Sequence, residues 1–440
     1  MENKTIYYYY DLNNSVRYLE DEDDEIKVMK TKDLYKLMAG KNHIFRPKGE
    51  YDNTDEDLIK YKEDFNIDCK EARGIKLKTR TGKYFSINYK KYESHNDAVF
   101  CNWMKHYVEK GMYSLFQKVK EFEFYIIERC YNGGLITLNL DHKNKVIQCH
   151  SRDYSSFYPR LMATMKIPSE DGKLYTFKQN ELEFGKLKYG IYRVKITYTN
   201  PKLTNVFNFS EDNHYTSQTL NGLFKYKEFF GITFTLLDAD KTFNYNALIY
   251  EYEQLIDGEK LFGEWLDDML NAKKQIPKNI LIKHLTSTLA GTLQSFKKVH
   301  FKSFKDIDLT RINSNVESDY KLLKKNDDNK YECVKSDDAY KYKLARIKPF
   351  IVAIGRSKVL SLIMDNDLLD YVVSIHTDRI CLTKDFDYSK SKKKYRYVPL
   401  PEAKSTGNII FHSCVDYKHV CLSCNTEYRY KDGHKCENKN

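Results

Sequence analysis

Residues 131–159, YNGGLITLNLDHKNKVIQCHSRDYSSFYP, form the stretch of this chain from which fold and chemistry are best predicted. Within it, Asp153 follows a strand-like run at 146–149 and precedes two serines, an aromatic pair and Pro159. This order predicts the end of a strand, a tight turn and the start of a helix. A carboxylate at a strand end, with the ring of Tyr158 five positions later, suits a metal-dependent phosphoryl-transfer site.

The composition indicates a globular protein with a polyanionic partner. The chain has 440 residues, of which 41% are hydrophobic, enough for two to four domains or one large enzyme with several subdomains. Its net charge of +11 is spread along the chain, and 37 tyrosines could line a single-stranded path by stacking. The alternative is that tyrosine and lysine are abundant because the source genome is AT-rich.

The sequence gives no sign of a membrane or secreted protein. No apolar run approaches the roughly 18–20 residues of a membrane span, and the N-terminus lacks a signal-peptide core. The ten cysteines are scattered, which argues against a dense disulfide framework. We therefore expect an intracellular protein in the cytoplasm of a host cell, with no membrane partner.

Residues 1–125 carry little chemical signal. Runs at 75–80 and 83–89 alternate around Thr81-Gly82, which predicts a hairpin. A proofreading exonuclease needs paired acids on a strand and a further aspartate to hold two metals, and the region offers no convincing set. The acidic run at 20–25 is expected to be a solvated loop. We expect this region to be a separate mixed α/β domain of unknown role.

A strand and an inserted segment follow the opening stretch. Residues 189–199 alternate in hydrophobicity and predict a strand of the same sheet as Asp153. Residues 200–240 are rich in Asn, Thr and Phe and are interpreted as an inserted subdomain. The paired glycines Gly133 and Gly134 permit close backbone approach to a ligand, and a simple turn is the alternative.

Residues 277–296, PKNILIKHLTSTLAGTLQSF, predict a helix with an apolar stripe. A second face carries one lysine followed by small residues, so a triphosphate could sit beside the lysine and a base pair over the small residues. These residues are Lys283, Ser287, Ala290 and Gly291. The alternative is close helix packing plus a surface lysine. Lys273 or Lys274, about one and a half to three helical turns before Lys283, is either a second phosphate contact or part of a surface pair.

The last third of the chain contains a second acidic turn. Residues 297–345 are strongly charged, and 324–329 are expected to form either a hairpin tip or a mobile loop. An apolar run at 349–355 leads into a helix at 359–364. Two β-rich runs within 371–382 then enclose the turn His376-Thr377-Asp378-Arg379. The turn places Asp378 where it can project into a cleft.

The C-terminal region combines a basic run with a candidate zinc site. The basic run KSKKKYR at 390–396 suits either phosphate contact or plain solvation. A CxxC pair followed by HxC fits four-coordinate structural zinc, with unpaired thiols as the alternative. The four candidate ligands are Cys421, Cys424, His434 and Cys436.

The order of these pieces resembles the polymerase half of protein-primed family B DNA polymerases of phages, adenoviruses and linear plasmids, over roughly residues 125–385. Tyr131-Asn132-Gly133-Gly134 is similar to the family's Tyr-x-Gly-Gly segment, which contacts the template. Residues 153–159 resemble motif A, residues 283–291 motif B, and residues 374–380 motif C. Four short matches in the right order carry the resemblance, because each alone is weak.

The resemblance implies roles for individual residues. Asp153 and Asp378 would be the catalytic ligands of two Mg²⁺ ions, and Tyr158 would exclude a 2′-hydroxyl. Nucleotide contacts would come from Lys283, Ser287, Gly291 and Lys274, and template or primer contacts from Tyr131, Gly133, Gly134 and Lys418. The partners would be template and primer DNA, deoxynucleoside triphosphates and a terminal protein or other priming protein.

Several positions depart from the family pattern. Motif C has His376 for its first aspartate and Arg379 for its serine, and motif B has Ser287 and Ala290 for asparagine and tyrosine. Lys418-His419-Val420 lacks the tyrosine of the family's Lys-x-Tyr segment. The exonuclease domain also lacks a counterpart. These departures leave an alternative open: a catalytically inactive polymerase-like subunit that binds nucleic acid in a replication complex.

The sequence thus predicts an α+β protein with right-hand polymerase architecture. It would have an antiparallel palm sheet, short helical fingers, an inserted subdomain and a small thumb-like or zinc-binding C-terminal region. The predicted function is template-directed DNA synthesis, with RNA-templated synthesis as a variant, in a protein of viral or mobile-element origin. The expected segments are 1–125, palm 126–199, insertion 200–245, palm-to-fingers 246–296, charged insertion 297–345, palm 346–388 and C-terminal region 389–440.

Overall fold

The computed structural model combines helices with mostly antiparallel sheets, as expected for an α+β protein. The chain forms two compact units, one made of Met1–Ala98 and Asp268–Leu285, the other of Val99–Asp267 and Thr286–Asn440. The structure describes residues 4–10, 15–20, 25, 27–30, 43–47, 75–78, 84–87, 95–109, 111–130, 133–241, 243–275, 280–301, 320–325, 331–386, 401–411, 413, 417–420 and 427–428.

The first unit contains a four-stranded sheet and a hairpin. The sheet has the order β3-β2-β1-β4, and only the β1–β4 pair is parallel. Tyr8 and Val16 are buried and pack together on it. The predicted hairpin around Thr81-Gly82 is confirmed by antiparallel pairing of β5 with β6. The strands are β1 (Lys4–Tyr10), β2 (Ser15–Glu20), β3 (Lys27–Lys30), β4 (His43–Pro47), β5 (Ile75–Lys78) and β6 (Tyr84–Ile87).

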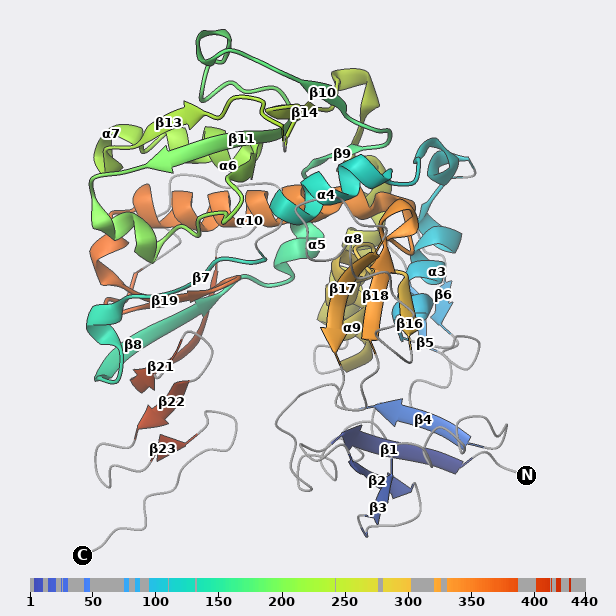
Figure 1. Cartoon of the computed structure of the whole chain (residues 1–440). Helices are drawn as coiled ribbons and strands as arrows, with labels where there is room; N and C mark the ends of the chain where they lie inside the picture. Colours follow the sequence, from blue (N-terminus) through green and yellow to red (C-terminus); the bar gives the residue numbers. More distant parts are fainter. Residues whose placement is uncertain are drawn as a thin grey trace, which may run out of the picture. The chain divides into compact units, whose positions relative to one another are not determined.

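The second unit is built on a seven-stranded antiparallel sheet that carries Asp153 and Asp378 (Figure 1). Its order is β23-β22-β21-β8-β20-β19-β7. Cys149, Cys381 and Phe411 are almost fully buried in its core, so the sheet is held by apolar packing across neighbouring strands. The strands are β7 (Ile136–Leu138), β8 (Val146–Asp153), β19 (Val372–His376), β20 (Arg379–Leu382), β21 (Glu402–Phe411), β22 (Tyr417–Val420) and β23 (Glu427–Tyr428).

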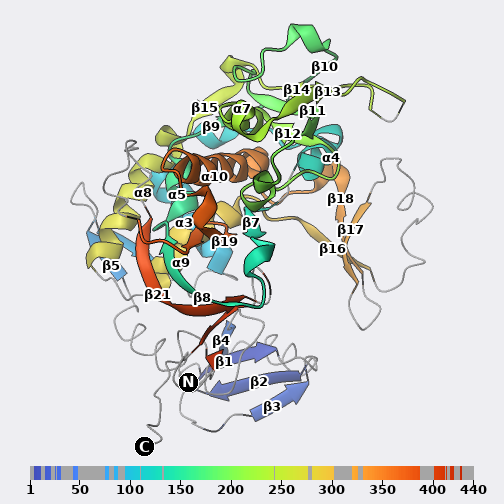
Figure 2. The ribbon, with the colours of Figure 1, turned by 90° about the vertical axis from the view of Figure 1, so that its left-hand side faces the viewer.

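One long helix, α10 (Ile347–Met364), lies between this sheet and a second sheet (Figures 1 and 2). We expected an apolar run followed by a separate helix at 359–364, and the structure corrects this to a single helix. Pro349 is tolerated in the first turn because that position needs no backbone N–H donor. Gly355 faces α5 (Phe157–Met162), where an added Cβ would lie 3.2 Å from the Phe157 ring.

The second sheet contains the strand at 190–197, which we had expected beside Asp153. That expectation is wrong: β11 pairs with β12, β13 and β14, and none of these strands belongs to the seven-stranded sheet. Hydrophobic alternation indicates a strand but not its partners, which are set by long-range pairing. The sheet comprises β10 (Lys173–Tyr175), β11 (Gly190–Thr197), β12 (His214–Thr216), β13 (Thr233–Leu236) and β14 (Ala247–Ile249).

The remaining elements surround these sheets. The hairpin predicted at 324–329 is confirmed by pairing of β17 with β18, although the residues at its tip lie outside those described. None of the described helices is long and apolar enough to cross a membrane. These elements are α3 (His95–Tyr107), α4 (Glu121–Cys130), α6 (Ser217–Phe224), α7 (Lys227–Phe230), α8 (Gly258–Gln275), α9 (Ile280–Thr292), β9 (Lys166–Pro168), β15 (Leu255–Asp257), β16 (Lys298–Phe301), β17 (Tyr320–Lys325) and β18 (Tyr331–Lys335).

Candidate active site

The two predicted metal ligands lie at the ends of neighbouring strands. Asp153 is the last residue of β8, and Asp378 belongs to the two-residue turn that joins β19 to β20. Arg379, the residue after Asp378, is directly opposite Asp153 in the ladder between β20 and β8. The backbone N–H of Tyr154 donates a 3.2 Å hydrogen bond to the carbonyl oxygen of Asp378. The sheet thus brings Asp153 and Asp378 to the same end of neighbouring strands.

Thr377 shapes the turn that carries Asp378. Its φ of +59° is the left-handed conformation that a tight two-residue hairpin loop requires. Its backbone N–H donates to the carbonyl oxygen of Leu135 at 2.7 Å. Its hydroxyl lies 2.7 Å from both Oδ1 of Asp378 and the carbonyl oxygen of His376, so its single proton is shared between these two acceptors. The hydroxyl thus contributes to orienting the carboxylate. We predicted no role for Thr377 from the sequence. A threonine in a tight turn, where glycine, asparagine or aspartate is usual, could have indicated one.

Gly134 lies against both the motif A tyrosine and the motif C turn. A Cβ at this position would collide with Cγ2 of Thr377 and lie 3.2 Å from the hydroxyl of Tyr158. Tyr158 is in the first turn of α5 and is partly exposed. The close packing of Thr377 explains why this position is a glycine. The predicted template contact of Gly134 stays a prediction. Tyr131, the predicted template contact, lies outside the described residues, and its role stays a prediction.

A buried arginine, Arg356, holds the backbone of the glycine segment by a hydrogen bond. Arg356 projects from α10, is 9% exposed, and donates a hydrogen bond to the carbonyl oxygen of Gly133. We predicted no role for Arg356 from the sequence, because it lies in the segment that leads into the helix expected at 359–364. The available signal was a cation within a strongly apolar helix, because such a residue is rarely buried without a partner.

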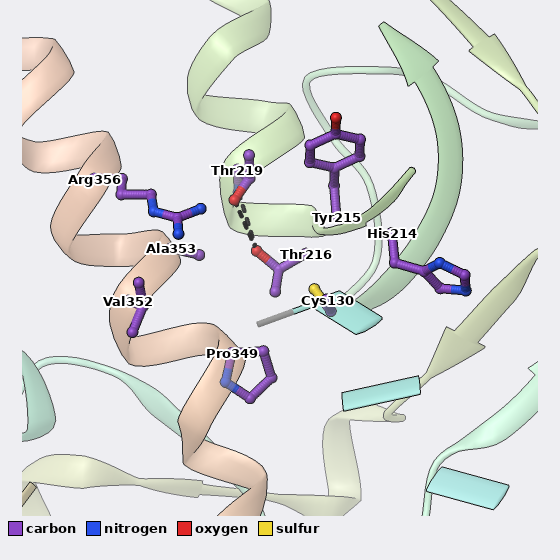
Figure 3. Close-up of a pocket in the computed structure, with 9 residues that line it drawn as sticks. All are labelled: Cys130, His214, Tyr215, Thr216, Thr219, Pro349, Val352, Ala353 and Arg356. Atoms are coloured by element: carbon purple, nitrogen blue, oxygen red, sulfur yellow. Dashed lines mark hydrogen bonds between the residues drawn. The ribbon is translucent and has the colours of Figure 1, made fainter. Parts of the chain in front are cut away.

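A small pocket adjoins Arg356, where α10 faces β12 and α6 (Figure 3). His214 is buried in its wall, and burial lowers the pKa of this imidazole to about 4. Burial also raises the pKa of the Cys130 thiol to about 12, so both groups are neutral at pH 7. Neither aspartate lines the pocket, so it is distinct from the two-aspartate site. Its lining is Cys130, His214, Tyr215, Thr216, Thr219, Pro349, Val352, Ala353 and Arg356.

The motif B helix is formed, with one correction to its predicted open face. Ser287 and Gly291 of α9 are exposed, and a Cβ on Gly291 would meet no atom within 4 Å. Ala290, which we had placed on the same face, is 5% exposed and belongs to the buried side. Lys283 lies in α9, but its side chain is outside the described part. Lys274 is exposed in the last turn of α8.

The other predicted sites fall largely outside the described residues. Lys418 is in β22, and its side chain is not among those described. The four candidate zinc ligands, Cys421, Cys424, His434 and Cys436, also lie outside the described ranges. Within those ranges, no group of three or more His, Cys, Asp or Glu side chains is placed to hold a metal. The zinc site therefore stays a prediction.

The carboxylate oxygens of Asp153 and Asp378 fit Mg²⁺. The turn presents hard oxygen donors, and Mg²⁺ typically takes one or two protein carboxylates while water and substrate phosphates complete its octahedron. Because no third acidic, His or Cys ligand joins them in the described structure, an ion here would take its other ligands from water or substrate. Burial, and to a lesser degree the charge of Arg379, lowers the pKa of His376.

Comparisons with known proteins identify a similar fold. No protein-family model and no curated protein matches the sequence. The structure is similar to phi29 DNA polymerase complexed with primer-template DNA and incoming nucleotides, with 12% identity, a TM-score of 0.53, and coverage of 98% of this chain and 89% of that chain. For phi29 DNA polymerase complexed with single-stranded DNA, the identity is 13%, the TM-score 0.54 and the coverage 95% and 87%. The likeness therefore extends beyond the segment that carries the four motifs.

Proposed function

We propose that this chain is a template-directed DNA polymerase that adds deoxynucleotides by phosphoryl transfer. The observation that carries the proposal is the meeting of Asp153, Asp378 and Tyr158 around one turn, within a fold similar to that of a DNA polymerase. These residues belong to motif A and motif C, which are far apart in the sequence. A purely structural role does not explain why two aspartates and a tyrosine lie together at one end of the sheet.

In the proposed reaction, a 3′-hydroxyl, or a hydroxyl of a priming protein, attacks the α-phosphate of a deoxynucleoside triphosphate. Two Mg²⁺ ions, when bound, would lower the pKa of the attacking hydroxyl and neutralise the triphosphate. Asp153 and Asp378 would hold these ions, and the Thr377 hydroxyl keeps the Asp378 carboxylate oriented. Pyrophosphate is the leaving group.

The surrounding residues would position the substrates. The ring of Tyr158 would block a ribose 2′-hydroxyl, and Gly134 would bring the backbone close to the template strand. Ser287 and Gly291 would leave room for the nascent base pair, while Lys283 would contact phosphate. Priming by a protein and the lack of proofreading are part of the same proposal, supported by the motif order and by the missing acid set at 1–125.

A second candidate function is a catalytically inactive, polymerase-like subunit that binds nucleic acid. It is favoured by one observation, the direct juxtaposition of Arg379 with Asp153, because a fixed cation beside a metal ligand opposes metal binding. His376 adds to this case, because an imidazole stands where the family has a carboxylate.

Primer extension separates the two candidates. Purified protein is assayed with Mg²⁺ on DNA-primed and protein-primed templates, with Asp153→Asn and Asp378→Asn as controls. We expect extension by the wild type and its loss in both variants. Extension that survives both substitutions would refute the assignment of the aspartates, and no extension under either priming condition would support the inactive subunit. Replacing the DNA template with RNA tests RNA-templated synthesis.

A further inference from the structure

Four charged or polar side chains form a row across four neighbouring strands of the seven-stranded sheet, at the end where β8 finishes with Asp153. In order across the strands, His376 pairs with Arg379, Arg379 with Asp153, and Asp153 with Glu402. Directly opposite residues of antiparallel strands project from the same face, with Cβ atoms roughly 4.5–5.5 Å apart. The guanidinium of Arg379 therefore belongs to the same face as the Asp153 carboxylate and lies next to it in the row.

The other charged residues near the row do not take the place of Arg379 beside Asp153. Glu402 is exposed and interacts with Arg160 of α5, whose pKa it partly restores against the lowering caused by burial. Arg152 precedes Asp153 on β8 and so projects from the opposite face, where it forms an ion pair with Asp385.

We propose that Arg379 is a resident counter-cation of Asp153 that weakens divalent-metal binding at the two-aspartate site until a triphosphate is present. This inference rests on the proposed function, because it concerns the same metal site. Arginine stays protonated at all physiological pH values, so its charge is permanent. Its repulsion of a divalent ion is twice that of a monovalent one, and the phosphate oxygens of a bound nucleotide would offset it.

The proposal makes Arg379 a positioning residue that couples metal binding to nucleotide binding. Without nucleotide, the guanidinium charge on the strand opposite Asp153 opposes the binding of a divalent ion there. With nucleotide, the guanidinium gains phosphate oxygens, which it binds well in a bidentate geometry. Its charge is then offset, and the metal binds Asp153 more tightly. A purely structural Arg379 would change stability when replaced, but not the metal affinity.

Mn²⁺ binding to the full-length protein tests this directly, by isothermal titration calorimetry after chelator treatment, with no DNA present. We expect Arg379→Ser to raise the Mn²⁺ affinity at least tenfold and Arg379→Lys, which keeps the charge, to stay near wild type. Arg152→Gln is the matched control, with less than a twofold change expected. Adding Asp153→Asn to Arg379→Ser should abolish the tightened binding, and a non-hydrolysable triphosphate should shrink the difference between wild type and Arg379→Ser.

Three outcomes would overturn the proposal: an Arg379→Ser affinity equal to that of the wild type, an equal gain in Arg152→Gln, or unchanged Mn²⁺ affinity with a loss of triphosphate affinity. If Arg379→Ser does not fold by circular dichroism, Arg379→Gln replaces it under the same criteria. The titration needs no DNA synthesis. A protein that never extends a primer but shows the expected shift in Mn²⁺ affinity therefore contradicts the proposed function and not this inference.

Discussion

The backbone N–H of Tyr154 donates a 3.2 Å hydrogen bond to the carbonyl oxygen of Asp378. This bond joins the residue after one catalytic candidate to the other candidate itself. The two carboxylates are thus brought together by main-chain pairing of β8 with β20, not by their own side chains. Side-chain substitutions at these positions should therefore leave the sheet intact, which makes loss of activity interpretable.

Gly134→Ala should damage the site through a steric collision. The new Cβ would meet Cγ2 of Thr377 and crowd the hydroxyl of Tyr158, and overpacking of this kind costs typically ~1–3 kcal/mol. We expect at least a tenfold loss of primer extension, measured under single-turnover conditions. The double variant Gly134→Ala/Thr377→Ser removes the colliding methyl group and should recover part of the rate. Full activity of the single variant would contradict the proposed approach.

Tyr158→Val should admit ribonucleotides. The ring lies beside the Gly134 backbone, and its removal opens the space where a 2′-hydroxyl would sit in the proposed site. We expect the ratio of deoxynucleotide to ribonucleotide incorporation to fall at least tenfold, measured from kcat/KM for each. Tyr158→Phe keeps the ring and is expected to keep the selectivity. Unchanged sugar selectivity in the valine variant would exclude a steric-gate role.

Gly291→Ala should separate stability from activity. Gly291 is near the end of α9, and an added Cβ would meet no atom, so the alanine should stabilise the fold by up to about 1 kcal/mol. If a base pair lies over this position, the same methyl group should slow nucleotide incorporation. Urea unfolding and single-nucleotide insertion measure the two effects. A more stable variant with unchanged insertion would indicate that Gly291 does not contact the nucleotide.

Arg346→Ala should be strongly destabilising. Arg346 is fully buried, and its single Nε–H is shared between both carboxylate oxygens of Glu123 at 2.9–3.0 Å. Its Nη2 donates to Glu123 at 2.7 Å and also pairs with Asp171. Removing one partner leaves a buried charge uncompensated, at a cost of about 3–5 kcal/mol. Denaturant unfolding measures the loss. Arg346→Met/Glu123→Met replaces both partners with apolar groups and should be less destabilised than the single variant; the opposite ranking would contradict this account.

His214 should make the fold sensitive to mild acid. Burial lowers its pKa from 6.5 to about 4 in the folded state, so the unfolded chain binds this proton more readily. The stabilisation is therefore complete above about pH 6.5 and is lost as the pH falls towards 4, by roughly 3 kcal/mol. The free energy of unfolding at pH 7 and pH 5 measures it. His214→Gln should show a weaker pH dependence, and equal slopes would exclude His214 as the cause.

Local signals in the sequence were enough for the elements that carry the two aspartates. The order strand, turn and helix around Asp153 is confirmed by β8 and α5, and the hairpin around Asp378 by β19 and β20. These predictions depend on alternation and turn residues, which act over a few positions. The single helix α10 was missed as such because its apolar residues surround it and give no periodic stripe.

The sequence by itself therefore determined the strand, turn and helix around Asp153 and the hairpin around Asp378, and it predicted which of their residues bear the chemistry. Only the tertiary structure decided that Gly134 meets Thr377 and Tyr158, that Arg356 holds Gly133, and that Arg379 is opposite Asp153. It also decided that the strand at 190–197 belongs to a different sheet. The physical reason is range: propensity and turn chemistry act between near neighbours, whereas strand pairing and close packing join residues far apart in the chain, whose partners no local pattern specifies.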